Sequence, residues 1–159
     1  MLGLWLGGAT AAAQVDFAAS VGGGYLDFGD VGRFGVATAV YISFADHALD
    51  LVPNAEYYYG KWSVDSDTPA ETIYAVGLDG HANLPPLANV LRPYVGTGVS
   101  YARHGGEGGV ALDLKTGAYV RATWSLHPYA QVTYRVVHDF ETVAPLDVYF
   151  LQGGLRVDL

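Results

Sequence analysis

The chain has 159 residues, of which 51% are hydrophobic and only 15% are charged, whereas a soluble domain carries about 25% charged residues. The length fits a single domain, and the low charge content indicates that something other than water covers part of its surface. A formal net charge of -8 excludes a nucleic-acid-binding surface, and the lack of Cys excludes disulfides and thiolate metal sites.

The N-terminal segment resembles the end of a secretory signal peptide. Residues 1–13 are mostly apolar and end in Ala11, Ala12 and Ala13, directly before Gln14, which fits an A-x-A cleavage site. The segment lacks the usual positive start, and it is too short for a spanning helix of about 20 residues. We expect residues 1–13 to be a signal-peptide remnant and residues 14–159 to form one barrel domain. The alternative for the first segment is an N-terminal strand or a disordered tail.

From Val15 onward, bulky apolar residues alternate with small, polar or charged ones. A period of two is typical of strands with two unlike faces. Pro53 interrupts the third run, where a proline removes one backbone donor. Eight such runs predict an all-β protein, an eight-stranded antiparallel up-and-down transmembrane β-barrel. The runs cover residues 15–25, 34–44, 49–59, 74–84, 94–101, 112–124, 129–136 and 149–159.

The connections differ in character along the chain. Residues 46–48 and 126–128 are expected to form short turns, and Pro85 and Pro86 mark another turn. Residues 65–71 and 104–109 are expected to form longer, more polar loops. Short turns on one side and longer loops on the other are typical of membrane barrels, and an even number of strands leaves both chain ends on the short-turn side.

The alternation alone fits two opposite barrels, one with apolar residues facing lipid and one with apolar residues inside. Side-chain size favours the first, because eight strands leave an interior only just wide enough for side chains. One face carries Leu, Val, Phe and Tyr, whereas the other mixes Gly, Ala and Ser with charges of both signs that can pair. The charged residues expected inside are Asp16, Asp50, Glu56, Asp79, Asp113, Asp158, Lys115, Arg121, Arg135 and Arg156.

Two stretches resemble a known family. The sequence RPYVGTGVSYA at residues 92–102 and the run at residues 117–136 are similar to strands of the OmpA- and OmpX-like outer-membrane β-barrels. The resemblance implies a monomer in the bacterial outer membrane, with outer-membrane lipid and the barrel-insertion machinery as its partners. Gly154, Val157 and Leu159 resemble the C-terminal insertion signal of that family, although Leu159 stands where phenylalanine is more typical.

Two groups of residues are candidate sites within the predicted barrel. Glu56, Asp79, Arg121, Arg135 and Arg156 are expected to form a charge network that plugs the lumen, with Arg135 paired to Glu56; a gated proton or ion path is the alternative. A second group is expected near the loop ends of the strands as an interfacial aromatic belt rather than a ligand-binding cluster. This belt consists of Tyr57, Tyr59, Trp62, Tyr74 and Tyr101.

The sequence contains no recognisable catalytic or metal-binding pattern. Its five histidines lack ligand spacing, no Gly-x-Ser-x-Gly elbow occurs, and His138 has no serine two residues later as in a barrel lipid A deacylase. We therefore predict a non-enzymatic outer-membrane protein without cofactor or metal, with a structural or loop-mediated interaction role. The alternative is a soluble or periplasmic lipocalin-like barrel that binds an apolar ligand.

Overall fold

The computed structural model describes residues 16–28, 31–62, 72–104, 107–122, 125–139 and 146–159. Residues 1–13, expected to be a signal remnant, lie outside this part of the chain. All regular structure in the described residues is strand, in eight segments of 11 to 14 residues. The strands are β1 (Asp16–Phe28), β2 (Val31–Phe44), β3 (Leu49–Trp62), β4 (Ile73–Asn83), β5 (Leu91–His104), β6 (Glu107–Val120), β7 (Leu126–Asp139) and β8 (Leu146–Asp158).

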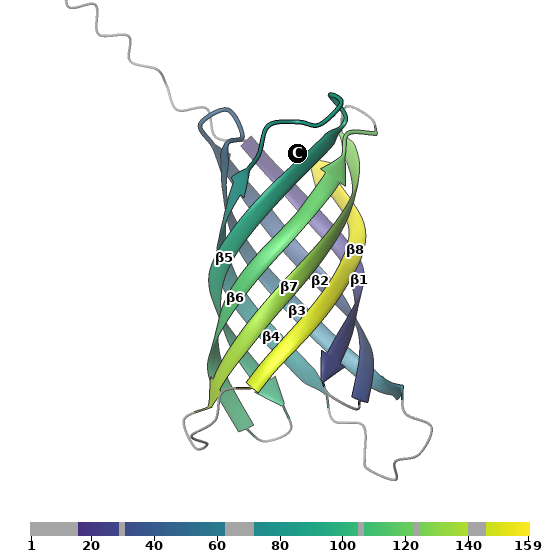
Figure 1. Cartoon of the computed structure of the whole chain (residues 1–159), viewed down its shortest axis with the longest axis vertical. Coiled ribbons are helices and arrows are strands. Elements are labelled where there is room, and N and C mark those ends of the chain that lie inside the picture. The colour runs from purple at the N-terminus through teal and green to yellow at the C-terminus, as the bar shows by residue number, and fades with distance from the viewer. Residues whose placement is uncertain (1–15, 29–30, 63–71, 105–106, 123–124, 140–145) are drawn as a thin grey trace, which may run out of the picture.

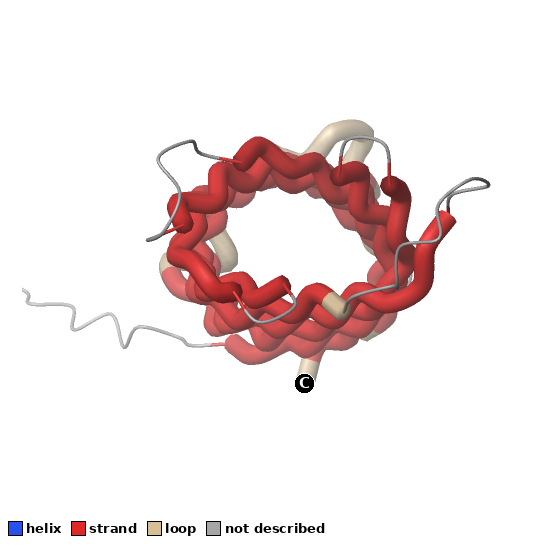
Figure 2. The backbone as a smooth tube through the Cα atoms, turned by 90° about the horizontal axis from the view of Figure 1, so that it is seen from below, coloured by secondary structure: helices blue, strands red, loops and turns tan. Residues whose placement is uncertain are grey.

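The strands form one closed antiparallel barrel in chain order (Figure 1). Each strand pairs with the next, and β1 pairs with β8 from Ala18 and Asp158 to Asp27 and Tyr149, which closes the ring seen in Figure 2. The predicted eight-stranded up-and-down barrel is therefore confirmed. The described residues include no helix of the length and apolarity needed to cross a membrane.

Several strands are longer than the alternation predicted. The expected loop at residues 104–109 is largely strand, because Ala102 pairs with Gly109 and Arg103 pairs with Gly108. A Cβ at Gly108 would approach the hydroxyl end of the exposed Tyr101 side chain, which would have to shift to make room. The expected turn at residues 126–128 is the start of β7, where Leu126 pairs with Val157.

The connections define two ends of the barrel. The turn end carries residues 45–48, 84–90, 121–122 and 125 together with Asp16 and Leu159, so both ends of the described part of the chain lie there (top of Figure 1). The opposite ends of the strands form the loop end. Only two residues separate β1 from β2 and β5 from β6 there, so the expected division into short turns and longer loops is wrong in part.

Pro53 lies within β3 without breaking the sheet. It is exposed on the outer face and pairs with Leu78 of β4. On its other side, Ala39 pairs with Asn54 and Ile42 pairs with Leu51, so the register with β2 is the same before and after the proline. The missing N–H therefore costs a local interruption of the ladder and no shift in which side chains face inward.

The turn between β2 and β3 contains three consecutive residues with left-handed backbone. Ala45, Asp46 and His47 have φ angles of 52°, 54° and 63°. The Asn83 side chain donates a hydrogen bond to the His47 carbonyl oxygen at 2.7 Å, and Ala48 N donates to Ala45 O at 3.1 Å. The turn thus holds three non-glycine residues in the left-handed region, which is unfavourable for residues with a Cβ.

We expect Ala45→Gly to raise the free energy of unfolding by about 0.5–1 kcal/mol, because removing Cβ relieves the left-handed strain at an exposed position. The measurement is a urea titration of the protein refolded in lipid vesicles. Ala48→Gly is the matched control, since Ala48 lies in the same turn without a positive φ and should give no gain. An equal gain at both positions would contradict the strain argument.

Inward and outward side chains differ in chemistry along every strand, and β6 shows this most clearly. Leu112 and Leu114 are 63% and 58% exposed, whereas Asp113 and Lys115 between them are 0% and 5% exposed. The large apolar side chains therefore point outward and the charged ones inward, as side-chain size predicted. This orientation contradicts the alternative barrel with an apolar interior, as far as the described residues extend.

The interior combines apolar and polar groups. An apolar cluster of Tyr58, Ile73, Val148 and Phe150 lies toward the loop end, and a second cluster of Ala18, Tyr41 and Val52 lies toward the turn end. Charged and amide side chains lie between these clusters, and a further buried charged pair, Asp50 and Arg156, lies nearer the turn end.

Candidate functional site

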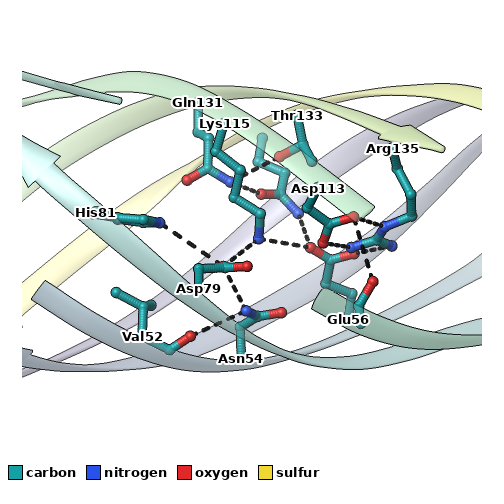
Figure 3. A network of polar contacts seen from close by, with 12 residues as sticks. Val52, Asn54, Glu56, Asp79, His81, Asp113, Lys115, Gln131, Thr133 and Arg135 are labelled. Carbon is teal, nitrogen blue, oxygen red and sulfur yellow. Dashed lines mark hydrogen bonds and ion pairs between the residues drawn. The ribbon is translucent and has the colours of Figure 1, made fainter. Parts of the chain in front are cut away.

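Five buried charged residues form an alternating chain across the middle of the lumen (Figure 3). Asp79 Oδ2 accepts a hydrogen bond from Lys115 Nζ at 2.6 Å, and Lys115 Nζ lies 3.9 Å from Glu56 Oε1. Glu56 Oε2 accepts from Arg135 Nη1 at 2.9 Å. Arg135 also donates from Nε and Nη2 to the two oxygens of Asp113, at 2.6 and 2.7 Å. We call these five residues the lumen network.

Strand register brings these side chains together. Asp113 on β6 and Arg135 on β7 are direct cross-strand partners, which permits the bidentate contact. Asp79 on β4 and Asp113 on β6 both pair with Gly98 of β5, which lies between them. A Cβ at Gly98 would overlap Asp79 Oδ1, so glycine leaves the space in which Asp79 lies flat against the wall and reaches toward β6.

Amide and hydroxyl side chains extend the lumen network. Gln152 Nε2 donates to Glu56 Oε1 at 3.1 Å and to Tyr58 Oη at 3.0 Å. Gln131 Nε2 donates to Gln152 Oε1 at 2.7 Å, and Tyr94 Oη donates to Gln131 Oε1 at 2.8 Å. These contacts satisfy buried polar groups that would otherwise cost about 1–3 kcal/mol each.

Arg156 forms a separate cluster nearer the turn end. Its Nη1 lies 3.4 Å from Asp50 Oδ2, and its guanidinium carbon lies 4.2 and 4.8 Å from the ring centroids of Tyr41 and Tyr119. Cation–π contacts of this kind hold an arginine in a partly desolvated place. Arg156 was predicted to belong to one charge network with Glu56 and Asp79, but its ion pairs are with Asp50 and Asp158 instead.

The space left among the lumen network is small. A cavity of about 20 Å³ is lined by Asn54, Asp79, His81 and Lys115, among others. A cavity needs at least about 10–15 Å³ to hold one water molecule, so this one has room for about one. Asn54 Oδ1, Asp79 Oδ1 and His81 Nε2 lack a protein hydrogen-bond partner beside it.

Comparison with known proteins rests on structure, because no family model and no curated protein sequence matches the chain. Neisserial surface protein A aligns over 92% of this chain and 99% of its own, with a TM-score of 0.66 and 15% identity. The N-terminal β-barrel domain of Pseudomonas aeruginosa OprF aligns over 92% and 100%, with a TM-score of 0.56 and 13% identity.

A third solved structure is Ail, the attachment invasion locus protein of Yersinia pestis. It aligns over 91% of this chain and 98% of its own, with a TM-score of 0.52 and 10% identity. The chain has the fold of the eight-stranded outer-membrane barrels. Each of the three alignments covers at least 91% of this chain and 98% of the solved chain.

Three of the five residues predicted for the charge network lie together in this barrel: Glu56, Asp79 and Arg135. The predicted contact between Arg135 and Glu56 is present at 2.9 Å. The prediction for Arg121 is wrong, because β6 ends at Val120 and Arg121 lies beyond it with an exposed side chain. Its backbone N donates to Val90 O at 2.8 Å, which ties it to the connection between β4 and β5 at the turn end.

Other lumen residues were misplaced or undervalued by the sequence interpretation. Asp113 and Lys115 were expected inside but not chosen as site residues, although they complete the lumen network. Asp16 and Asp158 were expected inside, yet their side chains are each 36% exposed at the turn end. Both occupy terminal positions of their strands, where an inward-pointing side chain lies at the rim of the barrel rather than in its interior.

The residues of the predicted aromatic belt lie on the outer face near the loop end. Tyr57, Tyr59, Tyr74 and Tyr101 are all exposed, and the side chain of Trp62 lies outside the described part of the chain. Further aromatic residues continue the band on other strands, and their role as an interfacial belt stays a prediction. These are Tyr25, Phe34, Tyr134 and Tyr149.

The predicted C-terminal insertion signal lies on the last strand and just after it. Gly154 and Val157 belong to β8, and Val157 points outward. Leu159 N donates a hydrogen bond to Phe17 O at 2.9 Å, which ties the end of the described chain to β1. Recognition of these residues by insertion machinery stays a prediction.

Proposed function

We propose that the chain is a bacterial outer-membrane protein that spans the bilayer as a monomeric barrel with a plugged polar lumen. Its role is structural or lies in interactions made at its aqueous ends. The observation that carries this proposal is the outward apolar face on all eight strands, combined with an interior of paired charges. Exposing that apolar outer face to water would cost free energy, whereas the hydrocarbon core of a bilayer would cover it.

Strand length agrees with this proposal. A tilted transmembrane strand needs about 9–11 residues to cross a bilayer, and the eight strands have 11 to 14. Closure between β1 and β8 pairs the strand edges with each other, as a barrel in hydrocarbon requires. The outer-membrane location of Neisserial surface protein A, OprF and Ail supports the same environment.

A non-enzymatic role is supported by how the polar groups are used. The carboxylates of the lumen network bind Lys115 and Arg135, and His81 stacks on Tyr94 with ring centroids 4.9 Å apart. Buried groups that satisfy one another stabilise the interior and are unavailable to a substrate. We assign the chain no reaction on this basis.

Cell fractionation and extraction test the proposed location. The mature protein should sediment with outer membranes and should require detergent for extraction, because the outward leucines and valines would otherwise be exposed to water. A control for mislocalised aggregates is heat-modifiable migration on gels, which reports a folded barrel. A folded monomer that stays in solution without detergent would contradict the proposal.

A conductance measurement tests the plugged lumen. Protein refolded into planar bilayers should give no steady single-channel steps, since the middle of the lumen is filled by ion pairs and the cavity there is about 20 Å³. Eight strands leave an interior that side chains fill. Reproducible steps from a preparation with confirmed insertion would support the ion-path alternative instead.

A further inference from the structure

The turn end of the barrel opens into a vestibule that is separate from the lumen network. A cavity of about 200 Å³ is lined by Asp16, Ser43, His47, Arg156 and Asp158, among others. A smaller cavity of about 40 Å³ adjoins it, since both are lined by His47, Arg156 and Asp158. The smaller one is also lined by Arg92, Tyr119, Arg121 and His127.

Three guanidinium groups from three parts of the chain converge on this vestibule. Arg92 is the second residue of β5, Arg121 follows β6, and Arg156 lies near the end of β8. Of the charged pairs formed within the described residues at 4.0 Å or less, none includes Arg92 or Arg121. These two side chains therefore form no ion pair with the carboxylates of the described residues.

The vestibule also contains acidic residues, but these have partners. Asp16 Oδ2 lies 3.2 Å from His47 Nε2, and Asp158 Oδ2 lies 2.9 Å from His127 Nε2. Asp158 Oδ1 lies 3.7 Å from Arg156 Nε. The carboxylates at the rim are thus held by histidines and by Arg156, which also binds Asp50 at 3.4 Å.

Two buried donors without a hydrogen-bond partner point to the chemistry of a ligand. Ser43 and Arg156 are only 2% and 4% exposed, and both line the larger cavity. Neither Ser43 Oγ nor Arg156 Nε has a hydrogen-bond partner in the protein. A buried N–H or O–H without a partner costs free energy, so an acceptor in this cavity would be stabilised by both.

We propose that the vestibule binds a small oxyanion, a phosphate or a carboxylate group, between Arg92, Arg121 and Arg156. Planar guanidinium groups bind both anions through paired N–H donors. Arg92 and Arg121 line the smaller cavity of about 40 Å³ together with Arg156, and this cavity adjoins the larger one of about 200 Å³. Both are smaller than the roughly 300–1,000 Å³ of pockets for drug-sized ligands, so they fit such a group rather than a large molecule. The anion could be a free ion or the charged group of a molecule that reaches the turn end.

Nuclear magnetic resonance of the barrel refolded in detergent micelles tests this site. Sodium phosphate and sodium acetate are titrated separately at constant ionic strength, with sodium chloride as the reference salt. Binding should shift the Nε–H signal of Arg156 and the amide signals of the turn-end residues in a saturable way. Saturation by phosphate alone, by acetate alone or by both supports the site and identifies the anion, whereas saturation by neither overturns it.

Arginine variants place the site at one end of the barrel. The double variant Arg92→Gln with Arg121→Gln should weaken binding by at least about 10-fold, and Arg121→Gln alone by about 3-fold. The matched control is Arg103→Gln, because Arg103 is an exposed arginine on the same strand as Arg92 but at the loop end. It should leave the affinity unchanged. Equal loss in Arg103→Gln, or no loss in Arg121→Gln and the double variant, would overturn the proposal.

Discussion

Replacing Arg135 by Met is expected to destabilise the barrel by about 3–5 kcal/mol, because it removes the cation from a buried ion pair and leaves charged partners behind. Arg135 is 1% exposed and binds both Asp113 and Glu56. The shift in the urea midpoint of protein refolded in lipid vesicles measures the loss. Met retains an unbranched apolar stem like that of arginine but lacks the guanidinium group, so it removes the charge while still filling part of the space.

Second-site variants distinguish the two partners of Arg135. Without Arg135, Glu56 still has Gln152 at 3.1 Å and Lys115 at 3.9 Å, whereas Asp113 keeps, among the described residues, a side-chain hydrogen bond only with Ser100, at 3.4 Å. Asp113→Asn should therefore restore more stability to Arg135→Met than Glu56→Gln does. The interpretation of the lumen network fails if neither second change makes the loss milder.

The second large effect is expected on the outer face. Val132 lies near the middle of β7 and is 44% exposed. Val132→Arg should lower the stability in vesicles by about 2–4 kcal/mol, because a charge on the lipid face must enter the hydrocarbon region near its midplane. The measurement is the same urea titration, with variants compared at equal lipid-to-protein ratio.

Val90→Arg provides a matched control for this effect. Val90 is also exposed, at 49%, but it lies in the connection between β4 and β5 at the turn end. If the barrel spans a bilayer, this position is outside or near its edge, where the cost falls to about 0–1 kcal/mol. Similar losses at Val90 and Val132 would contradict a lipid-covered outer face.

The sequence predicted the fold well because the period-two pattern is repeated in every strand. On β6, the alternation of Leu112 and Leu114 with Asp113 and Lys115 is sufficient to assign both faces. Side-chain size then decides which face is inside, since an interior of eight strands cannot hold the bulky face. The same alternation of inward and outward positions places Glu56, Asp79 and Arg135 in the lumen.

The period-two alternation no longer predicts where a side chain lies once the strand has ended. Arg121 is an even number of positions from Asp113 and Lys115, so the alternation places its side chain inside. It follows the last residue of β6, however, and lies at the turn-end mouth of the barrel. Residues 104–109 were expected to form a loop, although the ladder between β5 and β6 continues through Gly108 and Gly109. Strand ends are set by pairing with the neighbour, which a pattern within one strand does not contain.

Pairing within the lumen also depends on the register between strands. The sequence indicated that Arg135 needs an acidic partner, and it pointed to Glu56. It did not reveal that Asp113 lies directly across from Arg135 and takes two of its donors. Nor did it reveal Gly98, whose missing side chain lets Asp79 approach β6. Both follow from cross-strand neighbours rather than from residues adjacent in the sequence.

Spin labels on single introduced cysteines test the central claim most directly, since the chain has no Cys of its own. Labels at Leu112 on the outer face of β6 and at Val90 at the turn end are compared in vesicles for collisions with dissolved oxygen and with a water-soluble nickel complex. A lipid-covered outer face predicts frequent oxygen collisions and few nickel collisions at Leu112, with the reverse at Val90. Nickel collisions at Leu112 as frequent as at Val90 would show that water covers the outer face and would contradict the account.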